Sequence, residues 1–173
     1  MWGFTGILGK LIHLDALLIV WHRLWIAALA LGIYMLIKKR ITLPKGRTLM
    51  WSLVVGLVVA LHWITFYTSI QLSTASLGIL CLSTTTLHVT WLEPLIMRKR
   101  FSWIEFSMGL LVIGGIYFVA HDFKGEEQKA VLIGLVSALC AGIFSVANGK
   151  LAQQTDTAAL SFTELSTGLI ALS

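Results

Sequence analysis

Residues 16–37 read ALLIVWHRLWIAALALGIYMLI, and this stretch decides the fold. Apart from His22 and Arg23, its side chains are aliphatic or aromatic, and no proline interrupts it. As an α-helix it would rise about 1.5 Å per residue, enough to cross the ~30 Å hydrocarbon core of a bilayer. A run this long and this apolar predicts a transmembrane helix.

Similar apolar runs recur along the rest of the chain. We expect full spans at about residues 49–69, 75–97, 103–120 and 130–150, an incomplete first helix at 2–12, and a last helix that begins near Ala158. The composition agrees, because 57% of the 173 residues are hydrophobic and only 12% are charged, against roughly 25% charged residues in soluble chains. The predicted fold class is an all-α integral membrane protein, a multi-span helical bundle with about six and a half spans present.

Most of the Lys and Arg residues lie in two short loops between spans, at residues 38–47 and 98–100. By the positive-inside rule, these two loops face the cytoplasm. Their placement accounts for the net charge of +5, so we expect the lipid bilayer as a partner and no nucleic acid. Cys81 and Cys140 lie inside apolar runs without metal-like spacing, and we interpret them as packing residues.

An internal repeat emerges when the chain is shifted by 140 or 141 residues. The Gly-Lys-Leu at residues 9–11 then falls on the same three residues at 149–151, and Asp15 falls on Asp156. Five helices separate the two copies, so the second copy enters the membrane from the opposite side, as in the inverted repeats of many secondary transporters. We therefore predict two five-helix units, residues 1–122 and residues 123–173, ten spans in the intact protein, and a sequence truncated at both ends.

Several local motifs fit one known family. They are the stretch 74–97, the run Arg100-Phe101-Ser102-Trp103, Gly109 with Gly115, the opening Trp2-Gly3-Phe4-Thr5, and Arg23 in a Leu-rich second helix. With these motifs the whole chain resembles the EamA domain of the drug/metabolite transporter (DMT) superfamily, as one nearly complete domain and the start of a second. The resemblance implies ten helices in two inverted five-helix repeats, with alternating access to a central cavity.

The chain departs from the family pattern at two places. The family often has Pro near position 86, where this chain has Thr86 in a run of hydroxyl residues, and it often has Glu near position 99, where this chain has Lys99. These departures leave the subgroup, and hence the substrate, unassigned.

Polar side chains inside the spans are the candidate site residues, because a charge at the bilayer centre costs ~2.5–3.5 kcal/mol on insertion scales. Arg23 is interpreted either as an anchor for an anionic or carboxylate substrate or as a structural residue, paired or snorkelling. The other candidates form aromatic and hydroxyl-bearing faces, suited to a cavity for partly apolar metabolites or else to interhelical hydrogen bonds and interface belts. They are His62, Trp63 and Tyr67 on the third span, and Thr84, Thr85, His88 and Trp91 on the fourth.

Two carboxylates are candidates for gating or coupling. Glu93 lies one turn before the basic loop, where it is either a gate or one half of a salt bridge at the cytoplasmic rim. Glu164 takes the position of Arg23 in the repeat, so these opposite charges are expected to approach each other if the repeats meet face to face. The histidines of the spans lie on different helices without ligand spacing, and there is no Walker pattern, so we expect no metal and no cofactor.

The predicted function is secondary transport of small metabolites by alternating access, with export of amino acids or related compounds as the first choice. The expected location is a bacterial-type inner membrane. We expect no catalytic residues and no enzyme activity, since the ionisable residues are dispersed. The alternatives are an intramembrane enzyme acting on lipid-linked substrates and a non-transporting membrane subunit. The sequence leaves the substrate, the direction, the coupling ion and the oligomeric state open, with a homodimer among the options.

Overall fold

The computed structural model describes residues 2–39 and 42–173, and within these ranges the regular structure is helical. Apolar runs without proline or a cluster of turn residues favour helices, since in a bilayer every backbone group must be satisfied within its own segment. The elements are α1 (Trp2–Leu11), α2 (Ala16–Ile37), α3 (Gly46–Leu72), α4 (Ala75–Ser83), α5 (Thr85–Met97), α6 (Trp103–Ala120), α7 (Glu126–Leu151) and α8 (Thr157–Ala171).

Five helical segments of the described chain are long and apolar enough to cross a membrane. They are α2, α3, the stretch from Ala75 to Met97 that holds α4 and α5, α6, and α7. This finding confirms the predicted fold class, a multi-span all-α membrane protein. The observed bounds of α2 and α6 match the predicted spans, whereas α3 begins three residues earlier than expected, at Gly46.

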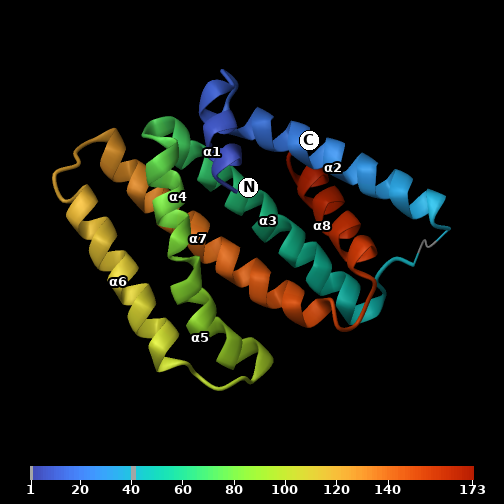
Figure 1. Cartoon of the computed structure of the whole chain (residues 1–173). Coiled ribbons are helices and arrows are strands. Elements are labelled where there is room, and N and C mark those ends of the chain that lie inside the picture. The colour runs from blue at the N-terminus through green and yellow to red at the C-terminus, as the bar shows by residue number, and fades with distance from the viewer. Residues whose placement is uncertain (1, 40–41) are drawn as a thin grey trace.

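Helix α7 forms the centre of the bundle. It packs against α3, α4 and α5, while α8 packs against α2 and α3 on the other side of the molecule (Figure 1). Helix α6 lies at the periphery beside α4 and α5, and large apolar side chains such as Trp103 and Phe118 are exposed on it. Exposed apolar surface of this extent suits contact with lipid and would be a liability in water.

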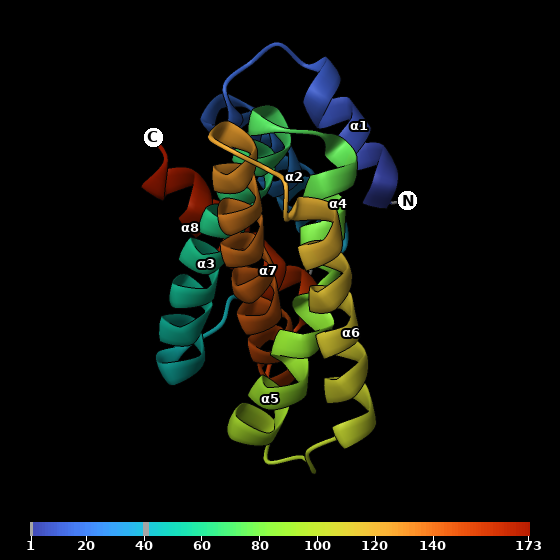
Figure 2. The ribbon, with the colours of Figure 1, turned by 90° about the vertical axis from the view of Figure 1, so that its left-hand side faces the viewer.

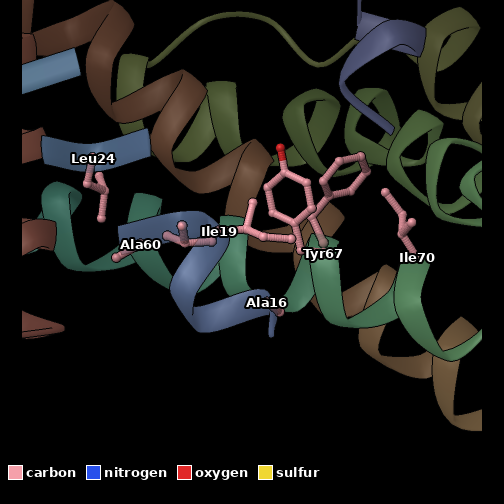
Figure 3. Close-up of a cluster of buried hydrophobic side chains, with 8 residues drawn as sticks. Ala16, Ile19, Leu24, Ala60, Tyr67 and Ile70 are labelled. Atoms are coloured by element: carbon pink, nitrogen blue, oxygen red, sulfur yellow. The ribbon is translucent and has the colours of Figure 1, made fainter. Parts of the chain in front are cut away.

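The largest buried cluster joins α2 to α3. Figure 3 shows Ile19 and Leu24 of α2 beside Ala60, Tyr67 and Ile70 of α3. Leucine and isoleucine side chains from both helices exclude solvent here, and Leu24 and Ile70 have no exposed surface. This cluster fixes the rotation of α2 relative to α3 and thereby the direction of the polar side chains on both helices.

Small residues bring α7 close to its neighbours. A Cβ atom added at Gly134 would lie 2.8 Å from Cβ of Cys81, and one added at Gly142 would lie 2.9 Å from Cβ of His88. Both distances are too short for a side chain, so glycine is required at these two helix crossings. Such small-residue contacts are a common way for membrane helices to associate.

The fourth predicted span is interrupted at Thr84, which separates α4 from α5. The hydroxyl of Thr84 donates to the carbonyl of Cys81 at 2.7 Å, and its backbone N–H also donates to that carbonyl. Ser83 repeats the pattern with the carbonyl of Leu80. Hydroxyl side chains that bind carbonyls one turn back compete with the regular ladder and can interrupt or bend a helix.

Helices α1 and α7 run in opposite directions through the bundle (Figure 2). Lys10, near the end of α1, donates to carbonyls at the C-terminal end of α3. Lys150, near the end of α7, instead donates at 3.0 Å to the carbonyl of Ile96, close to the C-terminal end of α5. This opposition agrees with the predicted inversion, whereas the division into two repeats at residue 122 stays a prediction.

Candidate functional site

Arg23 of α2 lies against two aromatic residues of α3. One of its guanidinium nitrogens donates to the hydroxyl of Tyr67, and Cζ lies 4.8 Å from the centroid of the Trp63 ring and 5.5 Å from that of Tyr67. Cation–π contacts of this kind contribute roughly 0.5–2 kcal/mol, most where water is excluded. The structure therefore brings together three of the predicted cavity residues, Arg23, Trp63 and Tyr67.

Local sequence explains how this cluster forms. Trp63 and Tyr67 are four residues apart on α3, so they project from the same face of the helix. Gly9 of α1 lies directly against the Tyr67 ring, where any larger residue would overlap it. The cluster is thus framed by α1, α2 and α3, about two turns from the ends of α2 and α3 that lie opposite the basic loops.

The electrostatics of Arg23 are unusual for a residue within a span. Among the residues that the structure describes, its side chain has no acidic partner, and its one protein hydrogen bond goes to the neutral Tyr67 hydroxyl. A guanidinium group carries five N–H donors in a planar fork. The remaining donors suit a carboxylate or phosphate, which such a fork binds in a bidentate manner.

His62 has a different environment from its neighbour Trp63. It is only 4% exposed, its Nδ1 lies 2.9 Å from both the carbonyl oxygen and the hydroxyl of Ser137, and its ring packs against Phe66 and Phe144. The Ser137 hydroxyl also lies 3.1 Å from the His62 carbonyl. These contacts describe a polar link between α3 and α7, which was the alternative interpretation of this residue.

The side chains of the fourth span that were predicted to share a face, Thr84, Thr85, His88 and Trp91, have different environments in the structure. His88 and Trp91 of α5 form an edge-to-face pair with ring centroids 6.3 Å apart, and Trp91 is 37% exposed. Thr84 is buried, and its hydroxyl donates to the carbonyl of Cys81 on α4. The Thr85 hydroxyl donates at 3.4 Å to the carbonyl of Ala138 on α7. The hydroxyls therefore hold helices together, and of the aromatic pair Trp91 is the more exposed, whereas Nδ1 of His88 is buried without a hydrogen-bond partner among the described residues.

The two predicted carboxylates have separate partners. Glu93 accepts a hydrogen bond from Lys99 at 3.0 Å, so it forms the ion pair at the rim that was one of its two interpretations. Glu164 of α8 is buried and accepts from the Asn148 amide of α7 at 3.1 Å. Glu164 and Arg23 thus have different partners, and no ion pair joins them in the described structure.

A groove of about 500 Å³ lies between α3, α5 and α7, at the end of the bundle that carries the basic loops. Its lining is mostly apolar, with Val55, Val58 and Ile143 among the residues, and it also includes the basic residues Arg47 and Lys150. The volume is of the size that small metabolites occupy. None of the eight residues predicted to line the substrate cavity lines this groove, so for those residues the cavity role stays a prediction.

Residues that the sequence analysis did not single out complete these sites. Ser137 is hydrogen-bonded to His62, and the amide of Asn148 donates to Glu164. Lys10 donates to the carbonyls of Ile70, Gln71 and Ser73. The repeat pointed to Lys10 and Lys150 as matched positions but gave them no role. Within the described ranges, no group of three His, Cys, Asp or Glu side chains is arranged to hold a metal ion.

These features define a class: a multi-pass helical membrane protein with polar residues set between its spans. Comparison with family models gives the particular family, because residues 1–120 match the EamA-like transporter family. The chain belongs to this family, which confirms the resemblance seen in the sequence and makes it a membrane transporter of the DMT type. No curated protein and no solved structure matches the chain significantly.

Proposed function

We propose that this protein is a secondary transporter that exports small carboxylate-bearing metabolites, such as amino acids or related compounds, across a bacterial-type inner membrane. The transporter class follows from the family. The substrate class, the direction and the alternating-access mechanism are our proposal.

Arg23 is the observation that carries the substrate class. It is half-buried in a span, has a tyrosine hydroxyl as its partner among the described residues, and stacks on two aromatic rings. A charge in this position needs a stabilising interaction, and the rings give only part of it. A substrate carboxylate bound to the free side of the fork would give the rest, while the Trp63 ring offers surface to an apolar part of the same molecule.

The groove at the opposite end supports alternating access. Arg23 lies in the half of the bundle away from the basic loops, and the groove opens beside them. Transporters of this kind bind substrate between two halves that rock around a fixed site. The groove would be the path on the cytoplasmic side, where Arg47 and Lys150 attract anions to its mouth.

Flux measurements on the full-length protein test the proposal. Cells that overproduce it would be loaded with a panel of labelled amino acids, other carboxylates and neutral compounds, and efflux would be followed over time. We expect faster efflux of at least one carboxylate, and at least a tenfold loss of that gain in Arg23→Gln. Unchanged flux across the whole panel would contradict transport, and faster efflux of neutral compounds alone would contradict the substrate class.

His22 provides the matched control for this substitution. It is adjacent to Arg23 but exposed, and its Nδ1 lies 2.8 Å from the carbonyl of Leu18 on its own helix. His22→Gln should therefore leave efflux unchanged. Membrane levels of both variants would be compared by quantitative blotting, so that lost insertion is not taken for lost binding.

A further inference from the structure

Glu164 lies in the middle of α8 and is only 3% exposed. Its Oε2 accepts from Nδ2 of Asn148 at 3.1 Å, while its Oε1 is buried and has no hydrogen-bond partner among the described residues. In the same part of the chain, Oδ1 of Asn148 is also buried without a partner. A buried acceptor without a donor destabilises a fold, because it loses its hydrogen bonds to water without replacement, so two such acceptors in one contact need an explanation.

The backbone around Glu164 leaves little freedom to relax this contact. A Cβ atom at Gly56 of α3 would lie 2.5 Å from the carbonyl oxygen of Glu164 and 3.0 Å from its Cα. One turn later, a Cβ atom at Gly168 would lie 3.2 Å from Cβ of Ala60. Helices α3 and α8 are thus pressed together, and α8 cannot rotate to carry the carboxyl into water without separating from α3.

The charged and titratable groups on the surrounding helices do not compensate a carboxylate here. None forms a hydrogen bond or an ion pair with Glu164 within the described chain. Arg23 is bonded to Tyr67, His62 to Ser137, and Lys150 to the carbonyl of Ile96. The remaining groups on the helices that contact α8 are His22 and Tyr34 of α2, Arg47 of α3, and Glu126, Glu127, Lys129 and the Cys140 thiol of α7.

A single proton would satisfy both orphaned atoms. An ionised carboxylate only accepts hydrogen bonds, whereas a protonated one has an O–H donor. With a proton on Oε1, Glu164 would donate to Oδ1 of Asn148 while Oε2 still accepts from Nδ2. The result is a neutral acid–amide pair with two hydrogen bonds, which removes both the unpaired acceptors and the uncompensated buried charge.

We propose that Glu164 and Asn148 form a proton-binding site between α7 and α8, with Glu164 protonated in this packed arrangement. The proton comes from water and returns to water, and no bond between heavy atoms changes. Release of the proton breaks the O–H hydrogen bond and leaves a charge on the α8 face, which favours separation of α8 from α7 and α3. The site stands on these contacts alone and does not depend on the proposed transport.

Infrared spectroscopy of the purified full-length protein in lipid nanodiscs tests this site directly. A protonated carboxylic acid has its own carbonyl-stretch band, which moves to lower frequency in D₂O. We expect this band at neutral pH in the wild type, its complete loss in Glu164→Gln, and a changed frequency in Asn148→Ala. No such band in the wild type at neutral pH would overturn the proposal, as would a band that survives in Glu164→Gln.

Glu93→Gln is the control, because Glu93 is partly exposed and paired with Lys99, and this change should leave the band intact. A pH titration of the wild type keeps the test independent of any variant's folding. The band should persist through neutral pH and disappear only in alkaline solution. Disappearance already in mildly acidic solution, where exposed carboxyls ionise, would refute the site.

Discussion

The helix pairs α1–α2 and α7–α8, which begin the two units of the predicted repeat, share a framework but differ in the chemistry of their polar side chains. In both pairs a lysine near the end of the first helix donates to the backbone near the C-terminal end of another helix. Lys10 of α1 donates to α3, and Lys150 of α7 donates to α5. At the matched position in the second helix, one pair carries Arg23 and the other Glu164. Arg23 packs against aromatic rings and has guanidinium N–H donors left for a ligand, whereas Glu164 is buried against the side-chain amide of Asn148.

The framework and the site chemistry are therefore specified by different residues. In the predicted repeat, Arg23 and Glu164 occupy matched positions along their helices. The partners on the facing helices, Trp63 and Tyr67 in one case and Asn148 in the other, decide whether that side chain can bind a ligand or a proton. Four sets of substitutions test this difference and the helix contacts behind it.

The largest effect is expected for Gly56→Ala. The new methyl group would lie 2.5 Å from the Glu164 carbonyl oxygen, which is backbone and cannot move without separating α3 from α8. Overpacking of this kind costs about 1–3 kcal/mol, and the melting temperature in detergent should fall clearly. Gly115→Ala on α6 is the control, since nothing lies within 4 Å of its added Cβ. Equal melting temperatures for the two variants would contradict the close contact of α3 and α8.

The matched glycines Gly9 and Gly149 should respond unequally. Alanine at Gly9 would overlap the Tyr67 ring, whose Cδ1 would be 2.7 Å away, and Tyr67 is buried. Alanine at Gly149 meets only Met97, at an ordinary 3.7 Å from Sδ. We expect Gly9→Ala to destabilise the protein by about 1–2 kcal/mol and Gly149→Ala to be tolerated, as measured by thermal unfolding. The reverse order would show that α1 does not frame the arginine cluster.

The two repeat aspartates should also differ. Asp156 accepts from the backbone N–H groups of Ala158 and Ala159 at 3.0 and 3.1 Å, whereas Asp15 makes no side-chain cap for α2. Loss of a capping side chain costs about 1 kcal/mol, so Asp156→Ala should lower the unfolding midpoint and Asp15→Ala should not. Matching shifts for both variants would mean that the caps are equivalent after all.

The smallest effect is expected for the rim ion pair. Glu93 and Lys99 are 32% and 52% exposed, and exposed pairs contribute roughly 0–1 kcal/mol. Lys99→Met should therefore change the unfolding midpoint by less than Asp156→Ala does, and raised salt should remove most of the difference from the wild type. A large change from Lys99→Met that raised salt does not remove would contradict a weak, exposed ion pair.

The spans could be predicted from the sequence because each rests on a local property. Residues 16–37 and 103–120 are predominantly apolar, and their ends are marked by polar or basic residues. The break at Thr84 was not predicted, although the hydroxyl run at residues 83–86 was noticed, because single hydroxyls occur in many continuous helices. Helix length and direction follow from composition, whereas interruptions depend on individual hydrogen bonds.

The sites were less predictable, because they depend on how helices rotate against each other. Arg23, Trp63 and Tyr67 were expected in one cavity and do lie together, since each projects from an apolar helix that must bury polar groups inward. The link from His62 to Ser137 spans 75 residues of sequence, and nothing in either segment marks the other. Likewise, no motif in the sequence around Asn148 marks it as the hydrogen-bond partner of Glu164.

Transport in a purified system tests the central claim most directly. The full-length protein would be reconstituted into liposomes without ATP, preloaded with an unlabelled carboxylate metabolite identified in the efflux panel, and exposed to a trace of the labelled compound outside. The account predicts transient accumulation of label in wild-type vesicles and at least a tenfold smaller signal with Arg23→Gln. Accumulation that is equal in the two preparations, or absent from both, would contradict a carboxylate transporter that works through Arg23.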